Sequence, residues 1–98
     1  MKTYDLLKCI DRVLDGFGSG AKQSVYLNIA LRKGIPYESL LENPDALSEA
    51  LKEVFDDSSN VVMTAIANEI GKVFGIKLDS SAGHFQENIE LACKQISK

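Results

Sequence analysis

The chain has 98 residues, of which 45% are hydrophobic and 26% are charged, and its formal net charge is −3. These are ordinary values for a folded globular domain, and they exclude a disordered chain. No apolar run approaches the roughly 18–20 residues that span a bilayer, and Asp5 and Asp11 would interrupt a secretion signal, so we expect one cytoplasmic domain over residues 1–98 with no membrane contact.

Apolar residues recur at intervals of three and four along the whole chain, which is the spacing of one helix face. The sequence therefore predicts an all-α domain, compact and orthogonal or bundle-like, of about five helices with no sheet. The first helix is expected over about residues 3–16, and the glycines of the stretch Gly16–Gly20 end it. Its expected core residues are Leu6, Ile10, Val13, Leu14 and Phe17.

The second helix ends at Lys33 in a strong stop signal, and Ser19 is expected to cap its start. Gly34 favours the left-handed backbone of a Schellman cap, and Pro36 cannot continue a helix. The apolar face of this helix is predicted from the positions of Val25 and Ile29, with Tyr26 and Ala30 alongside.

A single helical turn is expected over residues 37–41, before the third helix. Asn43 is a good N-cap residue, and Pro44 suits the first helical position because its missing N–H has no intrahelical partner there. The expected core face of this helix comprises Leu47, Ala50, Leu51, Val54 and Phe55.

The stretch Asp56–Asn60 breaks the third helix, and Ser58 or Ser59 is expected to cap the fourth. The fourth helix should stop at Gly75 by the same device that ends the second. A fifth helix is expected over about residues 82–97. The expected core residues of these two helices are Val62, Ile66, Ile70, Val73 and Phe74, then Phe85, Ile89, Ala92 and Ile96.

The segment from Gly20 to Ile76 carries the stretch GAKQSVYLNIALRKGIPYESLLENPDALSEALKEVF and a later apolar helix that closes in FGI. In these features it resembles the Nitrosopumilus-type output domain family, small helical domains of archaeal signal-transduction proteins. The resemblance implies a helical signalling-output or protein-interaction module, with no established chemistry, over about residues 20–76. The chain departs from the family pattern at Asp56–Asn60, where that pattern has a glycine-bearing turn.

Charge is unevenly distributed along the chain. Residues 1–37 hold six bases and three acids, for a net +3, whereas residues 38–57 hold seven acids and one base, for a net −6. Acids that recur at steps of three and four are expected on the outer face of the third helix. Such a face can be merely solvated, or it can dock a basic partner. The candidate partner-binding residues are Glu38, Glu42, Asp45, Glu49 and Glu53.

Little in the sequence points to chemistry. Cys9 and Cys93 lack a CxxC spacing and are expected to be two free, buried thiols. His84 is the single histidine, and its spacing from Cys93 places the two on opposite sides of the fifth helix. The stretch Asp56–Asn60 fails the calcium-loop pattern, and no nucleophile motif is present. The glycines at 16, 18 and 20 follow a helix and not a strand, which favours a hinge between helices; anion binding at the start of the following helix is the weaker alternative. We therefore expect no enzyme activity, no metal and no cofactor.

The sequence favours a non-catalytic protein-interaction or signalling-output module that uses the acidic face, with a homodimer through a terminal helix as a plausible state. One alternative is a nucleic-acid-associated regulator that uses the basic N-terminal region, although the net charge of −3 disfavours nucleic acid. Another is a small-molecule sensor with an interhelical pocket near Tyr26 and Tyr37. The sensitive positions of the basic region are Lys8, Arg12, Lys22, Arg32 and Lys33.

Overall fold

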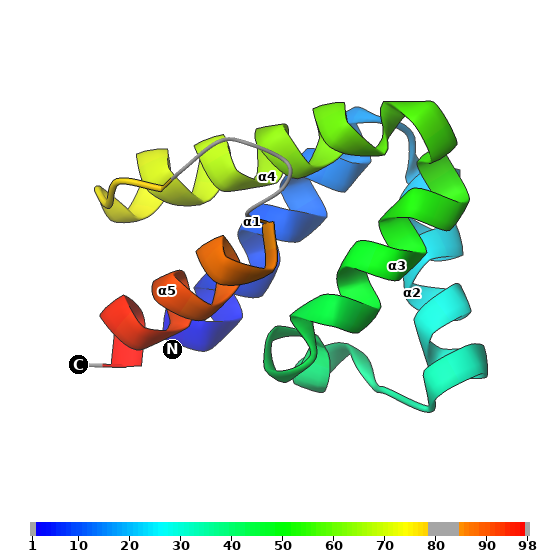
Figure 1. Cartoon of the computed structure of the whole chain (residues 1–98), viewed down its shortest axis with the longest axis horizontal. Helices are drawn as coiled ribbons and strands as arrows, with labels where there is room; N and C mark the ends of the chain where they lie inside the picture. Colours follow the sequence, from blue (N-terminus) through cyan, green and yellow to red (C-terminus); the bar gives the residue numbers. More distant parts are fainter. Residues whose placement is uncertain (1, 79–84, 98) are drawn as a thin grey trace.

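The computed structural model describes residues 2–78 and 85–97, apart from the side chains of residues 2–4, 19, 96 and 97. It contains five α-helices and two short 3-10 helices (Figure 1), and the described ranges contain no strand. The elements are α1 (Lys2–Gly16), α2 (Ser19–Lys33), η1 (Tyr37–Glu42), α3 (Pro44–Phe55), η2 (Asp56–Ser58), α4 (Ser59–Phe74) and α5 (Phe85–Ser97). The all-α prediction is confirmed. The predicted start of the fifth helix near residue 82 lies outside the described residues.

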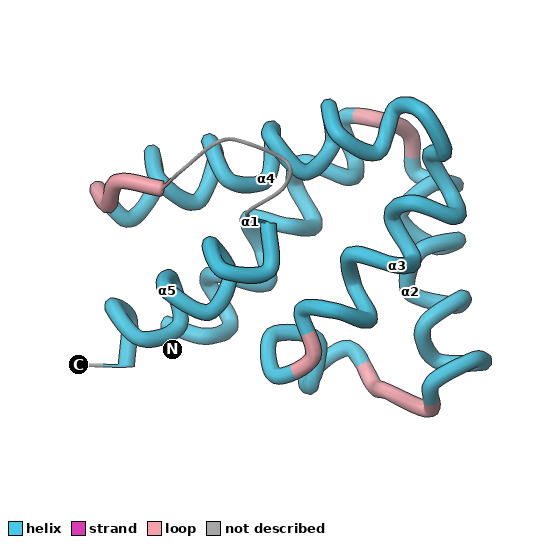
Figure 2. Tube along the Cα trace, in the orientation of Figure 1, coloured by secondary structure: helices cyan, strands magenta, loops and turns pink. Residues whose placement is uncertain are grey.

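Within residues 2–78 short loops join the helices, and the five helices form two groups (Figure 2). α2 and α3 run antiparallel at one end of the molecule, with η1 closing the turn between them (Figure 1). α1 packs against α4, and α5 contacts α1, α3 and α4. The Cα radius of gyration is 12.2 Å and the molecule measures 32 × 25 × 22 Å, so five helices surround one core.

Every α-helix contributes to this core. Leu6, Ile10 and Leu14 of α1 are fully buried, and so is Val25 of α2. Further core residues, from α2 to α5, are Ile29, Leu47, Ala50, Leu51, Val62, Ile66, Ile70, Phe85, Ile89 and Ala92. Burial of this apolar surface is the main driving force for folding. The expected packing of Ile96 lies outside the described side chains.

Two residues of the expected core are exposed, and so is Ala30, which was expected beside the apolar face of α2. Phe17 is 41% exposed, because it follows the last residue of α1 and the chain has already left the helical path there. Val73 is 46% exposed and lies in the last turn of α4. The helical spacing of apolar residues therefore did not predict burial correctly at these two positions, because both lie at helix ends.

Two glycines end helices at the predicted positions, but only Gly75 forms the predicted Schellman cap. Gly34 and Gly75 both have φ of 66°, in the left-handed region. At the end of α2, the Gly34 N–H donates to the Ala30 carbonyl at 3.1 Å, which is the simpler left-handed cap. At the end of α4, the Ile76 N–H donates to the Gly71 carbonyl at 3.2 Å, which is the long bond of a Schellman cap.

The N-caps differ in part from the predictions. Gly18, and not Ser19, occupies the N-cap position of α2. Asn43 does precede Pro44 at the start of α3, but its side chain makes no capping bond to that helix. Its amide instead donates to the Ser39 carbonyl at 2.9 Å, because the preceding 3-10 turn brings that oxygen within reach.

Candidate functional site

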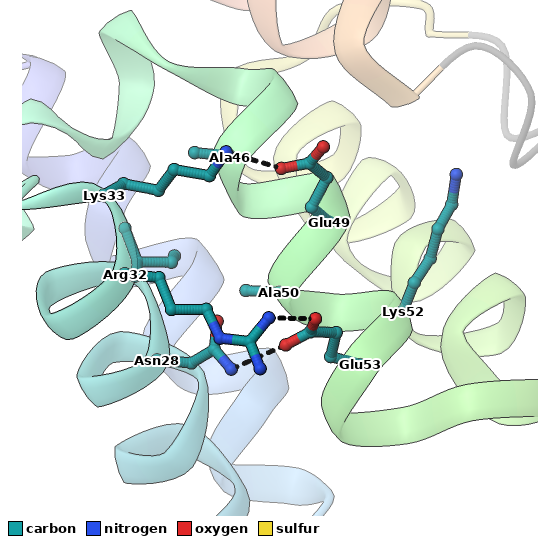
Figure 3. Close-up of a pocket in the computed structure, with 9 residues that line it drawn as sticks. Asn28, Arg32, Lys33, Ala46, Glu49, Ala50, Lys52 and Glu53 are labelled. Atoms are coloured by element: carbon teal, nitrogen blue, oxygen red, sulfur yellow. Dashed lines mark hydrogen bonds and ion pairs between the residues drawn. The ribbon is translucent and has the colours of Figure 1, made fainter.

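A groove of about 490 Å³ opens to solvent between α2 and α3 (Figure 3). Its floor consists of Ile29, Ala46 and Ala50, all of which are almost fully buried. The two alanines lie one turn apart on α3, and their small side chains leave space between the helices. The rim is polar and consists of Asn28, Arg32, Lys33, Glu49, Lys52 and Glu53.

Ion pairs cross the groove from one helix to the other (Figure 3). The Arg32 guanidinium bonds to Glu53 Oε1, and Lys33 Nζ lies 3.1 Å from Glu49 Oε2. The Asn28 amide donates to Glu53 Oε2 at 2.8 Å. The hydrogen bond from Asn28 and the nearby Arg32 guanidinium lower the pKa of Glu53. The pairs are exposed, so they contribute little to stability and an incoming charged segment can exchange with them.

The candidate acidic residues do not share one outer helix face, so that part of the prediction is wrong. Glu38 and Glu42 belong to η1, and only Asp45, Glu49 and Glu53 lie on α3. Glu49 and Glu53 pair with cations of α2 across the groove. The helical spacing was correct, but the sequence could not show that the basic C-terminal turn of α2 lies beside them.

Three further candidate carboxylates come before the groove residues of α3 in the chain: Glu38 and Glu42 belong to η1, and Asp45 belongs to the first turn of α3. Glu38, Glu42 and Asp45 are exposed, and no ion pair neutralises them within the described residues. We call these three residues the acidic ridge. Asp45 also lies in the first turn of α3, where the helix dipole favours a negative charge.

Tyr26 and Tyr37 meet each other and a shared carboxylate. Their ring centroids are 5.2 Å apart in an edge-to-face arrangement. The Tyr26 hydroxyl donates to Asp11 Oδ1, and the Tyr37 hydroxyl donates to Asp11 Oδ2 at 2.7 Å. Burial, and then the bond to Asp11, raise the pKa of Tyr26. We call these three residues the Asp11 junction, and it ties α1, α2 and η1 together.

The Asp11 junction changes the interpretation of the predicted tyrosine pocket. Neither tyrosine lines the α2–α3 groove or the second groove described below. Asp11 is the residue that the sequence interpretation missed. A signal for it was present in the sequence. Leu7, Asp11 and Leu14 follow at steps of four and three, and this helical spacing places the Asp11 carboxylate at the edge of the apolar face of α1.

A second, shallower groove of about 430 Å³ lies between α1 and α4. Arg12 crosses it and pairs with Glu69 at 2.7 Å. Phe17 lies at one end, where its ring packs edge-to-face against Phe55 with centroids 5.8 Å apart. The other lining residues are Val13, Gly16, Ala65, Asn68 and Lys72.

The basic N-terminal region is largely paired. Arg12 bonds to Glu69, and Lys22 lies 3.1 Å from Asp15. Arg32 and Lys33 are the two cations that cross the α2–α3 groove. Each of these four cations therefore has a carboxylate beside it, which leaves no continuous basic strip for phosphates among them.

Cys9 and Cys93 are thiols that form no disulfide with each other, as predicted, but the expected burial is confirmed only for Cys9. Cys9 is fully buried, whereas Cys93 is half-buried, and burial raises the pKa of both. Within residues 2–78 and 85–97, no three His, Cys, Asp or Glu side chains come together in a way that could hold a metal ion. His84 lies outside the described residues.

Comparison of the chain with models of protein families, with curated proteins and with solved structures finds no match. The resemblance to the Nitrosopumilus-type output domain family therefore stays a prediction. Among the helices that the structure describes, none combines the length and the apolar character that crossing a membrane requires.

Proposed function

We propose that the chain is a non-catalytic protein-interaction module of the cytoplasm, which binds an amphipathic helical segment of a partner in the α2–α3 groove. The observation that carries this proposal is the groove itself, with an apolar floor between two helices and a charged rim. Helix-in-groove recognition uses such a surface, because apolar anchors enter the floor while charged side chains meet the rim. The sequence resemblance to a signalling-output family favours the same class.

The charge around the groove favours a partner segment that is basic at one end. The rim alone holds the cations Arg32, Lys33 and Lys52 and the carboxylates Glu49 and Glu53. It therefore does not attract a basic segment by itself. The acidic ridge, in η1 and the first turn of α3, adds three carboxylates that no ion pair neutralises within the described residues. Exposed charges of this kind steer association and fix orientation more than they stabilise the fold.

Two observations weigh against the alternatives. The cations Arg12, Lys22, Arg32 and Lys33 are paired with carboxylates, so a nucleic acid would have to displace those partners. The hydroxyls of Tyr26 and Tyr37 are both bound to Asp11, so they are engaged within the protein. The interaction module is therefore the function that the geometry supports best.

The proposal can be tested by titrating the ¹⁵N-labelled protein with a synthetic helical peptide that has leucines on one face and lysines at one end. We expect the largest amide shifts at Ile29, Ala46 and Ala50, on the floor of the groove. Binding should weaken as salt rises, because exposed charges are screened beyond a Debye length of about 8–10 Å.

The acidic ridge is tested by the double variant Glu38→Lys with Glu42→Lys, since neither residue forms an ion pair with the described part of the chain. The matched control reverses two exposed acids elsewhere, Asp57→Lys with Glu90→Lys, and so has the same net charge. We expect the ridge variant to weaken peptide binding at least tenfold and the control to leave it within about twofold. Equal weakening by both variants, or shifts scattered away from the groove, would overturn the proposal.

A further inference from the structure

One carboxylate outside the α2–α3 groove binds both ends of the segment that forms one wall of that groove. Asp11 of α1 accepts the hydroxyl of Tyr26 on Oδ1 and the hydroxyl of Tyr37 on Oδ2. Tyr26 lies in α2, and Tyr37 is the first residue of η1. The groove residues that α2 contributes all lie between these two tyrosines in the chain: Asn28, Ile29, Arg32 and Lys33 (Figure 3). We call residues 26–37 the clamped segment.

The bonds to Asp11 differ in kind from the other contacts of the clamped segment. Ile29 lies in the core and Ile35 packs against it, but the attraction between apolar groups has no preferred direction. The ion pairs that cross the groove to α3 are exposed, so they hold the two walls together only weakly. A hydrogen bond, in contrast, weakens steeply when its length or its angle changes. The two partly buried bonds to Asp11 therefore define where the segment lies relative to α1.

The rest of the Asp11 junction makes this arrangement more rigid. The rings of Tyr26 and Tyr37 meet edge-to-face at an angle of 70°, which is a favourable geometry for an aromatic pair. A shift of either ring therefore disturbs both the ring contact and the carboxylate that the two hydroxyls share. α2 itself lies between Gly18 and Gly34, whose φ values are 122° and 66°. Because glycine permits many backbone conformations, both ends of α2 allow the helix to pivot once the junction is lost.

We propose that Asp11 is a positioning residue of the α2–α3 groove, which holds the α2 wall in place before a partner helix binds. Asp11 does not line the groove, so it acts on the partner only through Tyr26 and Tyr37. A preformed groove binds without first ordering its own wall, and such ordering reduces affinity. If the wall were in place for only a fraction of the time, the apparent affinity would fall by that fraction. This inference rests on the proposed function, because the groove is the proposed binding site.

The first experiment uses the free protein, so its result does not depend on whether a peptide binds. The double variant Tyr26→Phe with Tyr37→Phe keeps both rings and the net charge, and it removes both bonds to Asp11. Residual dipolar couplings of the amide N–H groups report the orientation of each helix. In the native chain one alignment tensor should fit α2 and α3 together. In the variant, the misfit of residues 28–33 to the tensor of the other helices should rise at least twofold, and an unchanged fit would overturn the inference.

The second experiment measures the rates at which the helical leucine and lysine peptide binds and dissociates. When the wall must first move into place, the association rate falls with the fraction of preformed groove, whereas the dissociation rate of the complex stays the same. For the double tyrosine variant we expect association at least tenfold slower and dissociation within about twofold of native. Ile70→Val is the control for a simple loss of stability, since Ile70 is buried in α4 and does not line the groove. It should leave both rates unchanged.

Asp11→Asn and its matched control Asp15→Asn separate the position of the carboxylate from its charge. Both variants remove one negative charge from α1, but Asp15 pairs with Lys22, which lies before the clamped segment. The amide of asparagine offers one acceptor oxygen where the carboxylate offers two. We expect Asp11→Asn to slow association at least threefold and Asp15→Asn to leave it within about twofold.

The outcomes distinguish this inference from the proposed function. Equal slowing by Asp11→Asn and Asp15→Asn, or a loss of affinity that appears only in the dissociation rate, would overturn the positioning role of Asp11. A native chain that does not bind the peptide in the groove would overturn the proposed function. In that case the dipolar couplings of the free protein still decide whether Asp11 holds the α2 wall in place.

Discussion

Asp56 has a backbone conformation that is unusual for any residue other than glycine. Its φ is 50° and its ψ is −118°, and among the described residues it is the one non-glycine residue with a positive φ. It stands where α3 ends, and its N–H donates to the Lys52 carbonyl. A non-glycine residue in such a sparsely populated backbone region costs on the order of 1–3 kcal/mol. The chain therefore carries local strain at the position where the resembled family has a glycine-bearing turn.

Replacing Asp56 by glycine should relieve this strain. Because glycine also adds conformational entropy to the unfolded chain, the net gain in the free energy of unfolding should be about 0.5–1 kcal/mol. Asp57→Gly is the matched control, since φ of Asp57 is not positive. This variant should lower the free energy of unfolding by about 0.5–1 kcal/mol. Urea denaturation measures both. If Asp56→Gly also lowered the midpoint, the strained conformation would not persist in solution.

The Asp11 junction predicts a dependence of stability on pH. The folded state raises the pKa of Tyr26 above its ordinary value of 10.0 through burial and the bond to Asp11, so the junction stabilises the protein fully below that pH. This stability is lost as the pH rises above about 10, because the unfolded chain then releases its proton more easily. The raised thiol pKa values of Cys9 and Cys93 act in the same direction from about 9.0 upward.

Tyr26→Phe isolates the tyrosine contribution, since it keeps the ring and removes the ionisable hydroxyl. We expect a loss of about 1 kcal/mol at pH 7 from the missing hydrogen bond, and a shallower fall in stability above pH 10 than in the native chain. Chemical denaturation between pH 7 and 11 provides the measurement. Identical slopes in the two proteins above pH 10 would contradict the assignment.

At the scale of a single element, the end of α4 depends on a close backbone approach. The chain folds back over Gly71 in the Schellman cap, and a Cβ added to Gly71 would lie 2.9 Å from the Ile76 carbonyl oxygen. That contact is with backbone, which cannot move aside as a flexible side chain would. Gly71 therefore serves the helix ending although it lies inside the helix.

Gly71→Ala sets two effects against each other. Alanine favours the helix by up to about 1 kcal/mol over glycine, but the clash requires the whole cap to shift. We expect the clash to dominate and the free energy of unfolding to fall by about 1 kcal/mol or more. Gly16→Ala at the end of α1 is the control, because nothing lies within 4 Å of its added Cβ, and it should be neutral or stabilising. Thermal denaturation measures the stability of both variants. If the cap opened freely, Gly71→Ala would be at least as stable as Gly16→Ala, which would contradict this prediction.

The helices themselves were largely predictable from the sequence, because their ends are marked by local chemistry. Gly34 with Pro36, Asn43 with Pro44, and Gly75 each act within a few residues, and the structure places helix ends at all three. The groove was not predictable, since it depends on which helices become neighbours. Glu53 illustrates the difference, because its place on an exposed helical stripe was correct while its pairing with Arg32 appears only in the folded chain.

The same limit applies to the tyrosines. Tyr26 and Tyr37 were noted as a pair, but their contact is organised by Asp11, which comes from another helix. Long-range polar contacts of this kind leave a weak pattern in a single sequence. Local signals therefore predicted the elements well, and they predicted the surfaces between elements poorly.

At the scale of the whole molecule, the two thiols report on different kinds of opening. Cys9 lies fully buried in α1, whereas Cys93 of α5 is half-buried. A thiol reagent should therefore label Cys93 first. Labelling of Cys9 should need an opening of the core and should accelerate with urea in step with global unfolding. A Cys93→Ser variant isolates the slow phase, and a Cys9 rate equal to that of an unfolded peptide would contradict the packing.

The Asp11 junction also determines how the protein can be observed by light. The chain has no tryptophan and three tyrosines, and the junction holds two of the three against one carboxylate. The ultraviolet absorption and emission of a phenol depend on whether its hydroxyl donates to a charged acceptor. The intrinsic optical signal of the native protein therefore comes in large part from the place where α1, α2 and η1 meet. A spectral change seen on adding a ligand, a denaturant or a second copy should be interpreted first as a change at that meeting point.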